Sequence, residues 1–520
     1  MTIADLVVRN ARQCPDQIAF VEVRPLSKER KETSWRLFDE RTNRLANALL
    51  ERGAVKGQKV ALLGRNSIHW LEAFFAILKT GACAVPLNFR FTDQDIQYCA
   101  DIAEPILFIA DQEYIERIHT LRPMLKTVKE VVGIGHGFPA GIQEMETLIG
   151  RASQVLPSIE IGDEEDCALY FTSGTTGAPK AVLHAHRSLV VTAILECTSH
   201  QWRTQDIHLM MAPLYHLAIG HLLGGVLVGA RNVLLTEQIH PKIIMETVSK
   251  ERVTMVFLLV PWALDLLEAL DRAEIHLKDY DVSNWKLMHM GAQPIPPSLV
   301  KRWKDYFPTM QYDTTYGLSE GGGPGVTHLG MENQHKLGAI GKPGLLWDVR
   351  IVDQHGRDVA IGEVGEMVVK GSGVMKEYYK NPDATAQTIK NGWLHTGDLA
   401  KADEDGFIYI VDRKKDLIIS GGENIYPIEI ENMIRRHPKV HDVAVIGVPD
   451  PRLGETVCAV IEKVPGEELT LSQMVAFYEE NLPRYKRPRH TVFGHVPRSA
   501  TGKIEKPKLR EAYAKGGLRP

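Results

Sequence analysis

Helical and strand patterns alternate along residues 34–104, and this alternation most limits the folds that the chain can adopt. Lys59–Leu63 and Ala82–Pro86 are buried-strand patterns, and Asn66–Ser67 can cap the helical pattern between them. Such a βαβ rhythm predicts an α/β fold with parallel sheets covered by helices. The apolar residues of the two helical patterns are predicted to pack in the core: Trp35, Leu37, Leu45, Ala46, Ala48, Leu49, Trp70, Phe74, Phe75 and Leu78.

The length and composition narrow the class of protein further. A chain of 520 residues is too long to fold around one hydrophobic core, so at least two domains are expected. The net charge of −4 argues against binding nucleic acid through bulk charge. Six scattered cysteines form no C-x-x-C pair, which favours a reducing compartment, and we expect a cytoplasmic protein. The N-terminus has no signal-peptide pattern, and the apolar run 222–230 is too short to span a bilayer.

A loop rich in Gly, Ser and Thr follows the short strand pattern Ala168–Phe171. Gly174 and Gly177 carry no Cβ, so backbone N–H groups can approach an anion closely. Lys180 adds a positive charge, but the proline before it and the alanine after it depart from the Walker A pattern. A flexible turn is the alternative interpretation. The density of donors favours a phosphate-binding loop, with hydroxyl groups from Thr172, Ser173, Thr175 and Thr176.

The segment Thr172–Lys180 resembles the phosphate loop of the adenylate-forming superfamily, which contains acyl-CoA synthetases, adenylation domains of peptide synthetases and luciferases. The resemblance covers most of the chain, because further motifs recur in the order found in that superfamily. It implies a large N-terminal domain (residues 1–412) with a small β subdomain, and a mobile α/β C-terminal domain (residues 413–520). It also implies a carboxylic acid:CoA ligase that uses ATP, Mg²⁺ and coenzyme A, and forms an acyl-adenylate before the thioester.

A second motif, Tyr312–Glu320, is similar to the Tyr-Gly-x-Thr-Glu motif of the superfamily, with Ser319 in place of the commoner Thr. Tyr316 offers a ring that can stack on adenine. Gly317 has no side chain, so the backbone can approach the nucleotide closely. The resemblance places the Ser319 hydroxyl at the α-phosphate. Glu320 offers a hard oxygen ligand for a nucleotide-bound Mg²⁺, although a lone Glu is more often a solvated surface group.

Two apolar segments carry the residues that the resemblance assigns to adenine and to the acid. The strand pattern in Lys286–Pro294 turns at Gly291, and ligands in such sheets bind beyond the carboxyl ends of the strands. The resemblance places adenine beside Gly291 and Ala292; an ordinary glycine turn is the alternative. It places His216 beside the adenylate and the acyl pocket; a hydrogen-bonded core histidine is the alternative.

Residues 362–411 are rich in Gly and in short β patterns, which predicts a small antiparallel β subdomain. Asp398 ends a Thr-Gly-Asp motif. The resemblance implies that its carboxylate accepts hydrogen bonds from the ribose hydroxyls. Arg413 lies in the charged run 412–416, and the resemblance implies that it contacts the ribose and phosphates. A solvated linker is the alternative interpretation of this run.

The C-terminal segment reads as a small α/β domain. Ile428–Ile434 is predicted to be helical, and Val443–Val448 is predicted to be a strand. The resemblance places Gly421 and Gly422 beside the pantetheine arm of coenzyme A. It makes Lys503 the mobile catalytic lysine, whereas composition alone would make it one solvated lysine in a basic tail.

The expected chemistry is electrostatic, because a carboxylate and a phosphate anion must meet. The candidate catalytic residues are Thr172, Lys180, His216, Glu320 and Lys503. Three alternatives stay open: an adenylating enzyme that loads a carrier-protein thiol, a non-catalytic nucleotide-binding homologue, and a luciferase-like oxygenase. The presence of all the chemical positions argues against the non-catalytic homologue.

The expected partner is a small carboxylic acid, with no nucleic acid and no membrane span. The candidate walls of its pocket are residues 215–220, 257–262, 288–291 and 321–323, which contain no Lys or Arg. Glycines 321–323 are expected to leave volume near the reacting centre, and His289 is expected to be a satisfied core histidine. We therefore expect a monocarboxylic acid with an aromatic, alicyclic or medium-chain body. The oligomeric state, a homo-oligomer included, stays open.

Overall fold

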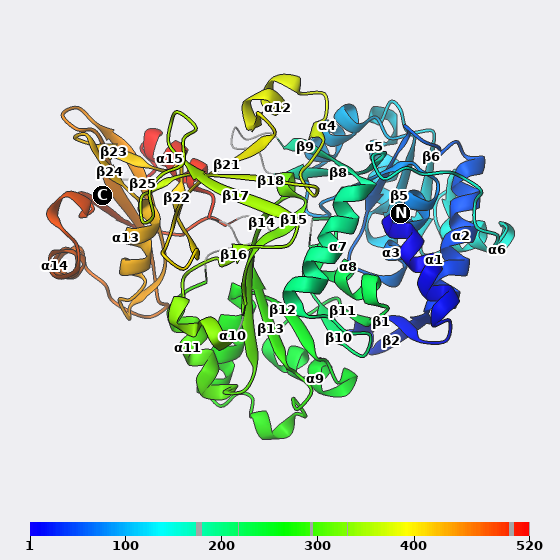
Figure 1. Cartoon of the computed structure of the whole chain (residues 1–520), viewed down its shortest axis with the longest axis horizontal. Coiled ribbons are helices and arrows are strands. Elements are labelled where there is room, and N and C mark those ends of the chain that lie inside the picture. Colours follow the sequence, from blue (N-terminus) through cyan, green and yellow to red (C-terminus); the bar gives the residue numbers. More distant parts are fainter. Residues whose placement is uncertain (173–178, 217, 292–294, 330, 499–503, 519–520) are drawn as a thin grey trace. The chain divides into compact units, whose positions relative to one another are not determined.

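The computed structural model describes residues 1–172, 179–216, 218–291, 295–329, 331–498 and 504–518. The chain forms two compact units. The first contains residues 1–337, 341–348 and 369–394, and the second contains residues 338–340, 349–368 and 395–520. Helices and strands alternate in the first unit (Figure 1), so the predicted α/β class is confirmed.

The first unit contains an eight-stranded sheet in the order β19-β9-β8-β4-β3-β5-β6-β7. Parallel pairing joins β8 to β4 and runs through β3, β5 and β6 to β7, whereas β8 and β9 are antiparallel. The predicted βαβ unit is confirmed here. The strands are β3 (Lys59–Leu63), β4 (Cys83–Leu87), β5 (Leu107–Asp111), β6 (Glu130–Ile134), β7 (Ile142–Glu144), β8 (Asp166–Thr172), β9 (Lys180–Ala185) and β19 (Glu377–Tyr378).

A nine-stranded sheet of the same unit has the order β16-β15-β14-β13-β12-β10-β11-β1-β2. Its central strands, from β14 to β1, are parallel, and antiparallel strands lie at both edges. The strands are β1 (Ile18–Arg24), β2 (Glu29–Ser34), β10 (Ile207–Met210), β11 (Arg231–Leu235), β12 (Met255–Leu259), β13 (Leu287–Gly291), β14 (Gln311–Leu318), β15 (Gly323–Leu329) and β16 (Lys342–Pro343).

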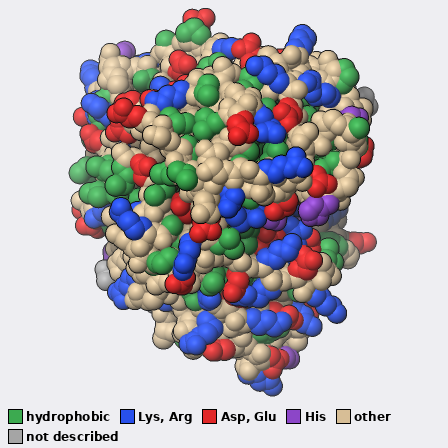
Figure 2. Space-filling view, turned by 90° about the vertical axis from the view of Figure 1, so that its right-hand side faces the viewer, with side chains coloured by type: hydrophobic (Ala, Val, Ile, Leu, Met, Phe, Trp, Pro, Cys, Tyr) green, Lys and Arg blue, Asp and Glu red, His purple; other side chains and the backbone are tan. Residues whose placement is uncertain are grey.

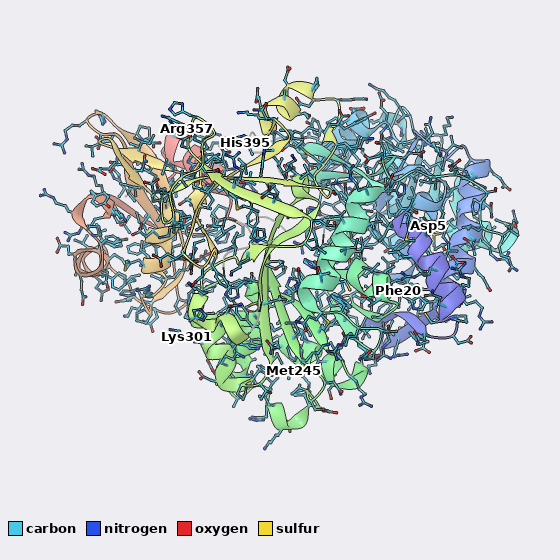
Figure 3. All side chains as sticks on the ribbon, in the orientation of Figure 1. Asp5, Phe20, Met245, Lys301, Arg357 and His395 are labelled. Atoms are coloured by element: carbon cyan, nitrogen blue, oxygen red, sulfur yellow. The ribbon has the colours of Figure 1, made fainter. Side chains whose placement is uncertain are left out.

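Several helices of the first unit begin at a side-chain cap. Ser67 accepts a hydrogen bond from Trp70 N at 3.0 Å and caps α3, as predicted. Thr2 and Asp5 form a capping box at α1, where Figure 3 labels Asp5. The helices are α1 (Ile3–Gln13), α2 (Trp35–Glu51), α3 (Ile68–Lys79), α4 (Asp93–Ala103), α5 (Gln112–Leu121), α6 (Met145–Arg151), α7 (His186–His200), α8 (Ile219–Val228), α9 (Pro241–Glu251), α10 (Val260–Asp271), α11 (Pro297–Tyr306) and α12 (Pro382–Thr388).

Aromatic packing joins the first strand to the helices that cover it. The ring centroid of Phe20, labelled in Figure 3, lies 4.7 Å from that of Phe38 and 5.5 Å from that of Trp35. The predicted core residues of α2 and α3 are buried with one exception. Leu37 is 46% exposed, so its core assignment was wrong. It stands two residues from Trp35, about 200° around the helix, and therefore faces the opposite side.

The second unit contains the small C-terminal α/β region and part of the predicted β subdomain, residues 362–368 and 395–411, whereas residues 369–394 belong to the first unit. β21 (Trp393–Ala402) pairs antiparallel with β22 (Ile408–Arg413). The other strands are β23 (Ile418–Ser420), β24 (Glu423–Ile425), β25 (Val440–Asp450), β26 (Gly454–Lys463) and β27 (His490–Phe493), and the helices are α13 (Pro427–Ile434), α14 (Leu471–Asn481) and α15 (Lys506–Ala514). The chain passes between the units within β17 (Trp347–Val352), β18 (Gly365–Gly371) and β21.

Basic and acidic side chains are interspersed on the face shown in Figure 2. Among the described residues, the helices are all too short or too polar to cross a bilayer.

Candidate active site

The predicted phosphate loop closes the antiparallel hairpin of β8 and β9. Thr172 and Lys180 are paired across this hairpin, so the two ends of the loop lie face to face. The strand that precedes the loop therefore holds Thr172 opposite Lys180. The remaining predicted residues of the loop, Ser173, Gly174, Thr175, Thr176 and Gly177, lie outside the described residues.

Tyr378 connects the phosphate loop to the second motif. Strand β19 pairs with β9, which sets Tyr378 opposite Val182. The Lys180 ammonium lies 4.6 Å from the centroid of the Tyr378 ring, and the Tyr378 hydroxyl donates a 2.7 Å hydrogen bond to Glu320 Oε1. Burial and the Glu320 carboxylate raise the pKa of Tyr378, so its hydroxyl stays a donor. Sequence analysis did not anticipate Tyr378. Thr172, Lys180, Ser319, Glu320 and Tyr378 are called the motif cluster below.

Glu320 has the donor chemistry that a magnesium site requires. It lies in the short 3₁₀ helix η3 (Ser319–Gly321), directly after β14, and is half-buried. Its Oε1 is held by Tyr378, and its backbone carbonyl accepts a 2.8 Å hydrogen bond from Met375 N. Among the described residues, Oε2 has no hydrogen-bond partner. A positioned carboxylate oxygen beside a phosphate loop fits Mg²⁺, which binds through one or two carboxylates and phosphates.

His184 fixes the position of the second motif from β9. Its Nε2 lies 2.7 Å from the carbonyl oxygen of Ser319. Burial lowers the pKa of His184 to about 4, so the ring is neutral and donates this bond through an Nε2 proton. This residue was also missed, because a histidine on a buried strand shows no sequence signal that distinguishes it from a packing residue.

The glycines that follow Glu320 serve close packing. A Cβ on Gly321 would lie 2.7 Å from Trp347, and one on Gly323 would lie 2.7 Å from Thr192. A Cβ on Gly322 would overlap the carbonyl of Gly373, and Gly322 has a φ of +80°. The expectation that residues 321–323 leave open volume is therefore wrong, since neighbouring groups already fill the space.

The residues assigned to adenine lie at the carboxyl ends of two adjacent parallel strands. Gly291 ends β13, and Tyr316 and Gly317 lie near the end of β14. A Cβ on Gly291 would lie 3.4 Å from the carbonyl oxygen of Thr315, so the two strand ends approach closely. Ala292 lies outside the described residues. The roles of Gly291, Tyr316 and Gly317 at adenine stay predictions.

His216 lies just before helix α8. Its carbonyl accepts a 3.2 Å hydrogen bond from Ile219 N, and its ring centroid lies 4.5 Å from that of Tyr215. The side chain is half-buried. Its role at the acyl pocket stays a prediction.

The second unit brings Asp398 and Arg413 together. They are opposite each other across β21 and β22, and Arg413 Nε lies 2.5 Å from Asp398 Oδ1. Asp398 is 3% exposed, and its backbone N–H donates to Thr396 Oγ1 at 3.0 Å. On the same strand, His395 (labelled in Figure 3) lies 3.2 Å from Glu366. The Thr-Gly-Asp motif is thus held rigidly within this unit.

Gly421 and Gly422 form the turn between β23 and β24, with φ values of +60° and +90°. These values favour glycine, which gives the pair a structural reason independent of coenzyme A. Gly421 N also donates to the carbonyl of Leu453 at 2.9 Å. Lys503 lies outside the described residues, and its role stays a prediction.

A second polar cluster, buried in the first unit, was almost wholly missed by sequence analysis. His200 Nδ1 lies 2.8 Å from Glu196, and its Nε2 lies 2.9 Å from Asp313. His221 Nδ1 lies 2.6 Å from the other oxygen of Glu196. The geometry of these contacts is not that of directed hydrogen bonds, so they are close electrostatic contacts between imidazole rings and carboxylates. His289 Nε2 lies 3.0 Å from Thr315 Oγ1, in line with the expected satisfied core histidine. These five residues, Glu196, His200, His221, His289 and Asp313, are called the His–carboxylate network below.

Positively charged and negatively charged groups lie next to each other in this network. Burial alone would lower the pKa of His200, but the carboxylates of Asp313 and Glu196 raise it to about 10. Burial would raise the pKa of Glu196, yet His221 and His200 hold it well below its usual range. Burial and the two neighbouring histidines lower the pKa of His289, which is therefore neutral. A buried carboxylate is thus held ionised between two imidazole rings.

Known proteins match the whole chain. The family model described as AMP-binding enzyme matches residues 7–379, and the AMP-binding enzyme C-terminal domain matches residues 429–503. A feruloyl-CoA synthase from Amycolatopsis sp is 34% identical over 92% of this chain and 93% of its own length. An indoleacetate–CoA ligase from Aromatoleum aromaticum is 32% identical over 91% of each chain. The crystal structure of the anthranilate CoA ligase AuaEII in complex with anthranoyl-AMP superposes with a TM-score of 0.89 and 26% identity, over 99% of this chain and 98% of that chain.

Proposed function

Because the chain belongs to the AMP-binding enzyme family and is an AMP-forming acyl-CoA synthetase, we propose that its acid is a monocarboxylic acid with an aromatic, alicyclic or medium-chain body. ATP and coenzyme A are its other substrates. Support for the acid class comes from the candidate pocket walls, which lack Lys and Arg to pair a second carboxylate. The relatives named for ferulate, indoleacetate and anthranilate point to the same class.

The chemistry follows from the poor leaving group of a carboxylate. A carboxylate oxygen attacks the α-phosphorus of ATP, and pyrophosphate departs. The thiolate of coenzyme A then attacks the acyl carbonyl, and AMP departs in place of oxide. Both reactants of the first step are anions, so positioned cations and N–H dipoles are the groups that lower its barrier.

The observation that carries the proposed site is the contact series from Lys180 through Tyr378 to Glu320. It joins two motifs that are far apart in the sequence, with a cation over the ring of Tyr378 and a carboxylate at its hydroxyl. In the proposal, Lys180 and Ser319 bind phosphate oxygens, and Tyr378 orients the Glu320 carboxylate. Mg²⁺ held by Glu320 would neutralise phosphate charge when bound.

The two steps are proposed to use two arrangements of the chain. Residues 413–520 would turn as a domain about a hinge in the charged run 412–416. Lys503 would serve adenylation in one arrangement. Gly421 and Gly422 would face the pantetheine arm in the other, while Asp398 and Arg413 bind the ribose. We also infer that Thr172 and the loop to Gly177 surround the phosphates, that Tyr316, Gly291 and Ala292 border adenine, and that His216 borders the acid.

The test is product analysis with a mixed panel of acids, ATP and Mg²⁺, with and without coenzyme A. We expect AMP, pyrophosphate and an acyl-CoA, with the thioester formed only when coenzyme A is present. Detection of ADP and phosphate would contradict the mechanism, since attack would then occur at the γ-phosphate. AMP release without thioester formation would favour loading of a carrier-protein thiol. If acetate or a dicarboxylate had the highest kcat/KM, the proposed acid class would be wrong.

A further inference from the structure

The His–carboxylate network depends on an unusually close approach of two helices. In Figure 1, α7 and α8 lie side by side. A Cβ on Gly220 would lie 2.6 Å from Thr192, and one on Gly224 would lie 2.9 Å from the Cβ of Glu196. Both spacings are too short for a larger residue, so the glycines of α8 are what bring His221 against Glu196.

The network includes a residue of the second motif, because Asp313 lies within Tyr312–Glu320. Thr315, which contacts His289, directly precedes Tyr316 on β14. The ring of Phe257 stacks on His221 at 4.0 Å between centroids, and its Cε2 would lie 3.5 Å from a Cβ on Gly291. Side chains in contact therefore connect the strand ends assigned to adenine with the first turn of α8.

His221 is the most exposed member of the network. Its side chain keeps 12% of its surface open, whereas Glu196 keeps 1% and His200 keeps none. Phe257 covers one face of its ring, His289 packs against it at 4.7 Å between centroids, and Glu196 covers Nδ1. The open surface therefore lies toward Nε2. Among the described residues, none offers Nε2 a hydrogen bond.

The protonation of His221 follows from its contact with Glu196. An ionised carboxylate can only accept, so the ring nitrogen that lies 2.6 Å from Glu196 Oε1, Nδ1, is the one that carries the proton in the neutral ring. Nε2 is then an acceptor in the neutral ring and a donor in the charged ring. A hydroxyl group can satisfy either state, because it both donates and accepts.

We propose that His221, oriented by Glu196, binds a hydroxyl group on the body of the acid, so that the preferred substrates are hydroxylated monocarboxylic acids. This inference rests on the proposed function and narrows its acid class. The network supplies the selectivity through Nε2 of the largely buried His221, which no described residue hydrogen-bonds. An acid that lacks the hydroxyl leaves Nε2 without a partner when it excludes water, which costs binding free energy. The carboxylate of Glu196 also disfavours a second anion on the acid.

Matched acid pairs test the proposal on the wild-type enzyme. Suitable pairs are benzoate and para-hydroxybenzoate, phenylacetate and para-hydroxyphenylacetate, cyclohexanecarboxylate and its para-hydroxy derivative, and octanoate and its terminal hydroxy derivative. We expect kcat/KM to be about 10- to 100-fold higher for the hydroxylated member of at least one pair, on the scale of one hydrogen bond in a buried site. If no acid gives AMP and thioester, the proposed function fails; if the deoxy member is preferred in every pair, only this inference fails.

Two substitutions of His221 separate binding from positioning. In His221→Asn the amide nitrogen can replace Nδ1 beside Glu196, but nothing replaces Nε2. In His221→Gln the longer side chain returns an amide to the position of Nε2. We expect the preference for the hydroxyl to fall about 10-fold or more in the Asn variant and to be largely regained in the Gln variant. His136, whose side chain is 74% exposed, provides the matched control His136→Gln, which should keep the wild-type preference.

Thermal unfolding of each variant and its half-saturation for ATP show whether a change arises from misfolding. If His221→Asn folds and keeps the hydroxyl preference, the proposal is wrong.

The network also groups metal-ligand atoms within 4.8 Å of one another, in the sets Glu196, His221, His289 and His200, His289, Asp313. Stoichiometric zinc or another divalent metal in the purified protein, lost in His221→Asn, would overturn the proposal in favour of a metal site. We expect none, because each carboxylate already has an imidazole partner.

Discussion

The motif cluster and the His–carboxylate network lie in the same unit and use the same kinds of side chain, but they differ in burial and in what their charges face. Glu320 and Lys180 are half-buried, and the Tyr378 side chain joins them: its ring lies against Lys180 and its hydroxyl donates to Glu320. The carboxylates of Glu196 and Asp313 are 1% exposed, and imidazole rings lie against both.

This difference implies a division of work. Charges at an open strand end can bind the phosphates that every acid needs, so the motif cluster should affect all acids alike. Charges enclosed in the core act mainly through the most exposed member of the network, which is His221. The network should therefore affect stability and the choice of acid. The following changes test this division, from the largest expected effect to the smallest.

Replacing Lys503 should separate the two half-reactions. Lys503→Ala removes a cation that acts as the carboxylate meets the α-phosphate, so adenylation should slow about 100-fold or more, roughly 3 kcal/mol. A supplied acyl-adenylate should still react with coenzyme A at near the wild-type rate. Single-turnover kinetics on each half-reaction measure both. Equal slowing of the two halves would give Lys503 a structural role, and no slowing would make it a solvated lysine.

Breaking the network at its centre should affect stability. Glu196→Gln leaves His200 and His221 without their shared carboxylate, which should lower the free energy of unfolding by roughly 3 kcal/mol. Glu246, which is 31% exposed and lies 3.3 Å from Lys250, provides the control Glu246→Gln, with an expected loss below about 1 kcal/mol. Urea denaturation measures both. Equal losses would mean that burial does not distinguish the network from a surface pair.

Removing the Tyr378 hydroxyl should weaken the motif cluster without changing the choice of acid. Tyr378→Phe keeps the ring beside Lys180 and removes the hydrogen bond to Glu320. We expect kcat/KM to fall about 10- to 30-fold for every acid, on the scale of a hydrogen bond to a charged group, with a higher half-saturation for Mg²⁺. Steady-state kinetics across the acid panel check this. A fall confined to some acids would contradict the division of work.

The pH dependence of stability should report the charge on His200. Its pKa is raised to about 10, so the native protein keeps a proton that the unfolded chain loses near pH 6.5. The stabilisation is fully present below about pH 6.5 and is lost as the pH rises through about 10, by at most about 1.4 kcal/mol for each pH unit. Urea denaturation at each pH gives the free energy of unfolding of the wild type and of His200→Gln. The difference between the two values isolates the effect of His200. A pH-independent difference would show that His200 is neutral.

The sequence alone predicted the parts of the molecule that depend on local patterns. The βαβ unit, the Ser67 cap and the strand before Thr172 follow from periodicity and from capping chemistry, and the structure confirms them. The phosphate-binding roles of Thr172 and Lys180 were predicted from donors and charge, and that of Ser319 from resemblance; these roles stay predictions.

Tyr378 could not be predicted, because its place depends on the pairing of β19 with β9, two strands that are distant in the sequence. The His–carboxylate network could not be predicted for a different reason. Thr192, Glu196 and His200 recur every four residues on α7, a pattern that normally predicts a solvent-facing stripe. The close packing of Gly220 and Gly224 against this stripe buries it instead, and only the fold reveals that packing.

The most direct test of the division of work combines Tyr378→Phe and His221→Asn in one double-mutant cycle. The measurement is kcat/KM for a hydroxylated acid and its deoxy partner in the wild type, both single variants and the double variant. We predict that Tyr378→Phe lowers both values by the same factor, that His221→Asn lowers the ratio between them, and that the two effects multiply, because the residues share no contact. A changed ratio in Tyr378→Phe, or an equal loss for both acids in His221→Asn, would contradict the account.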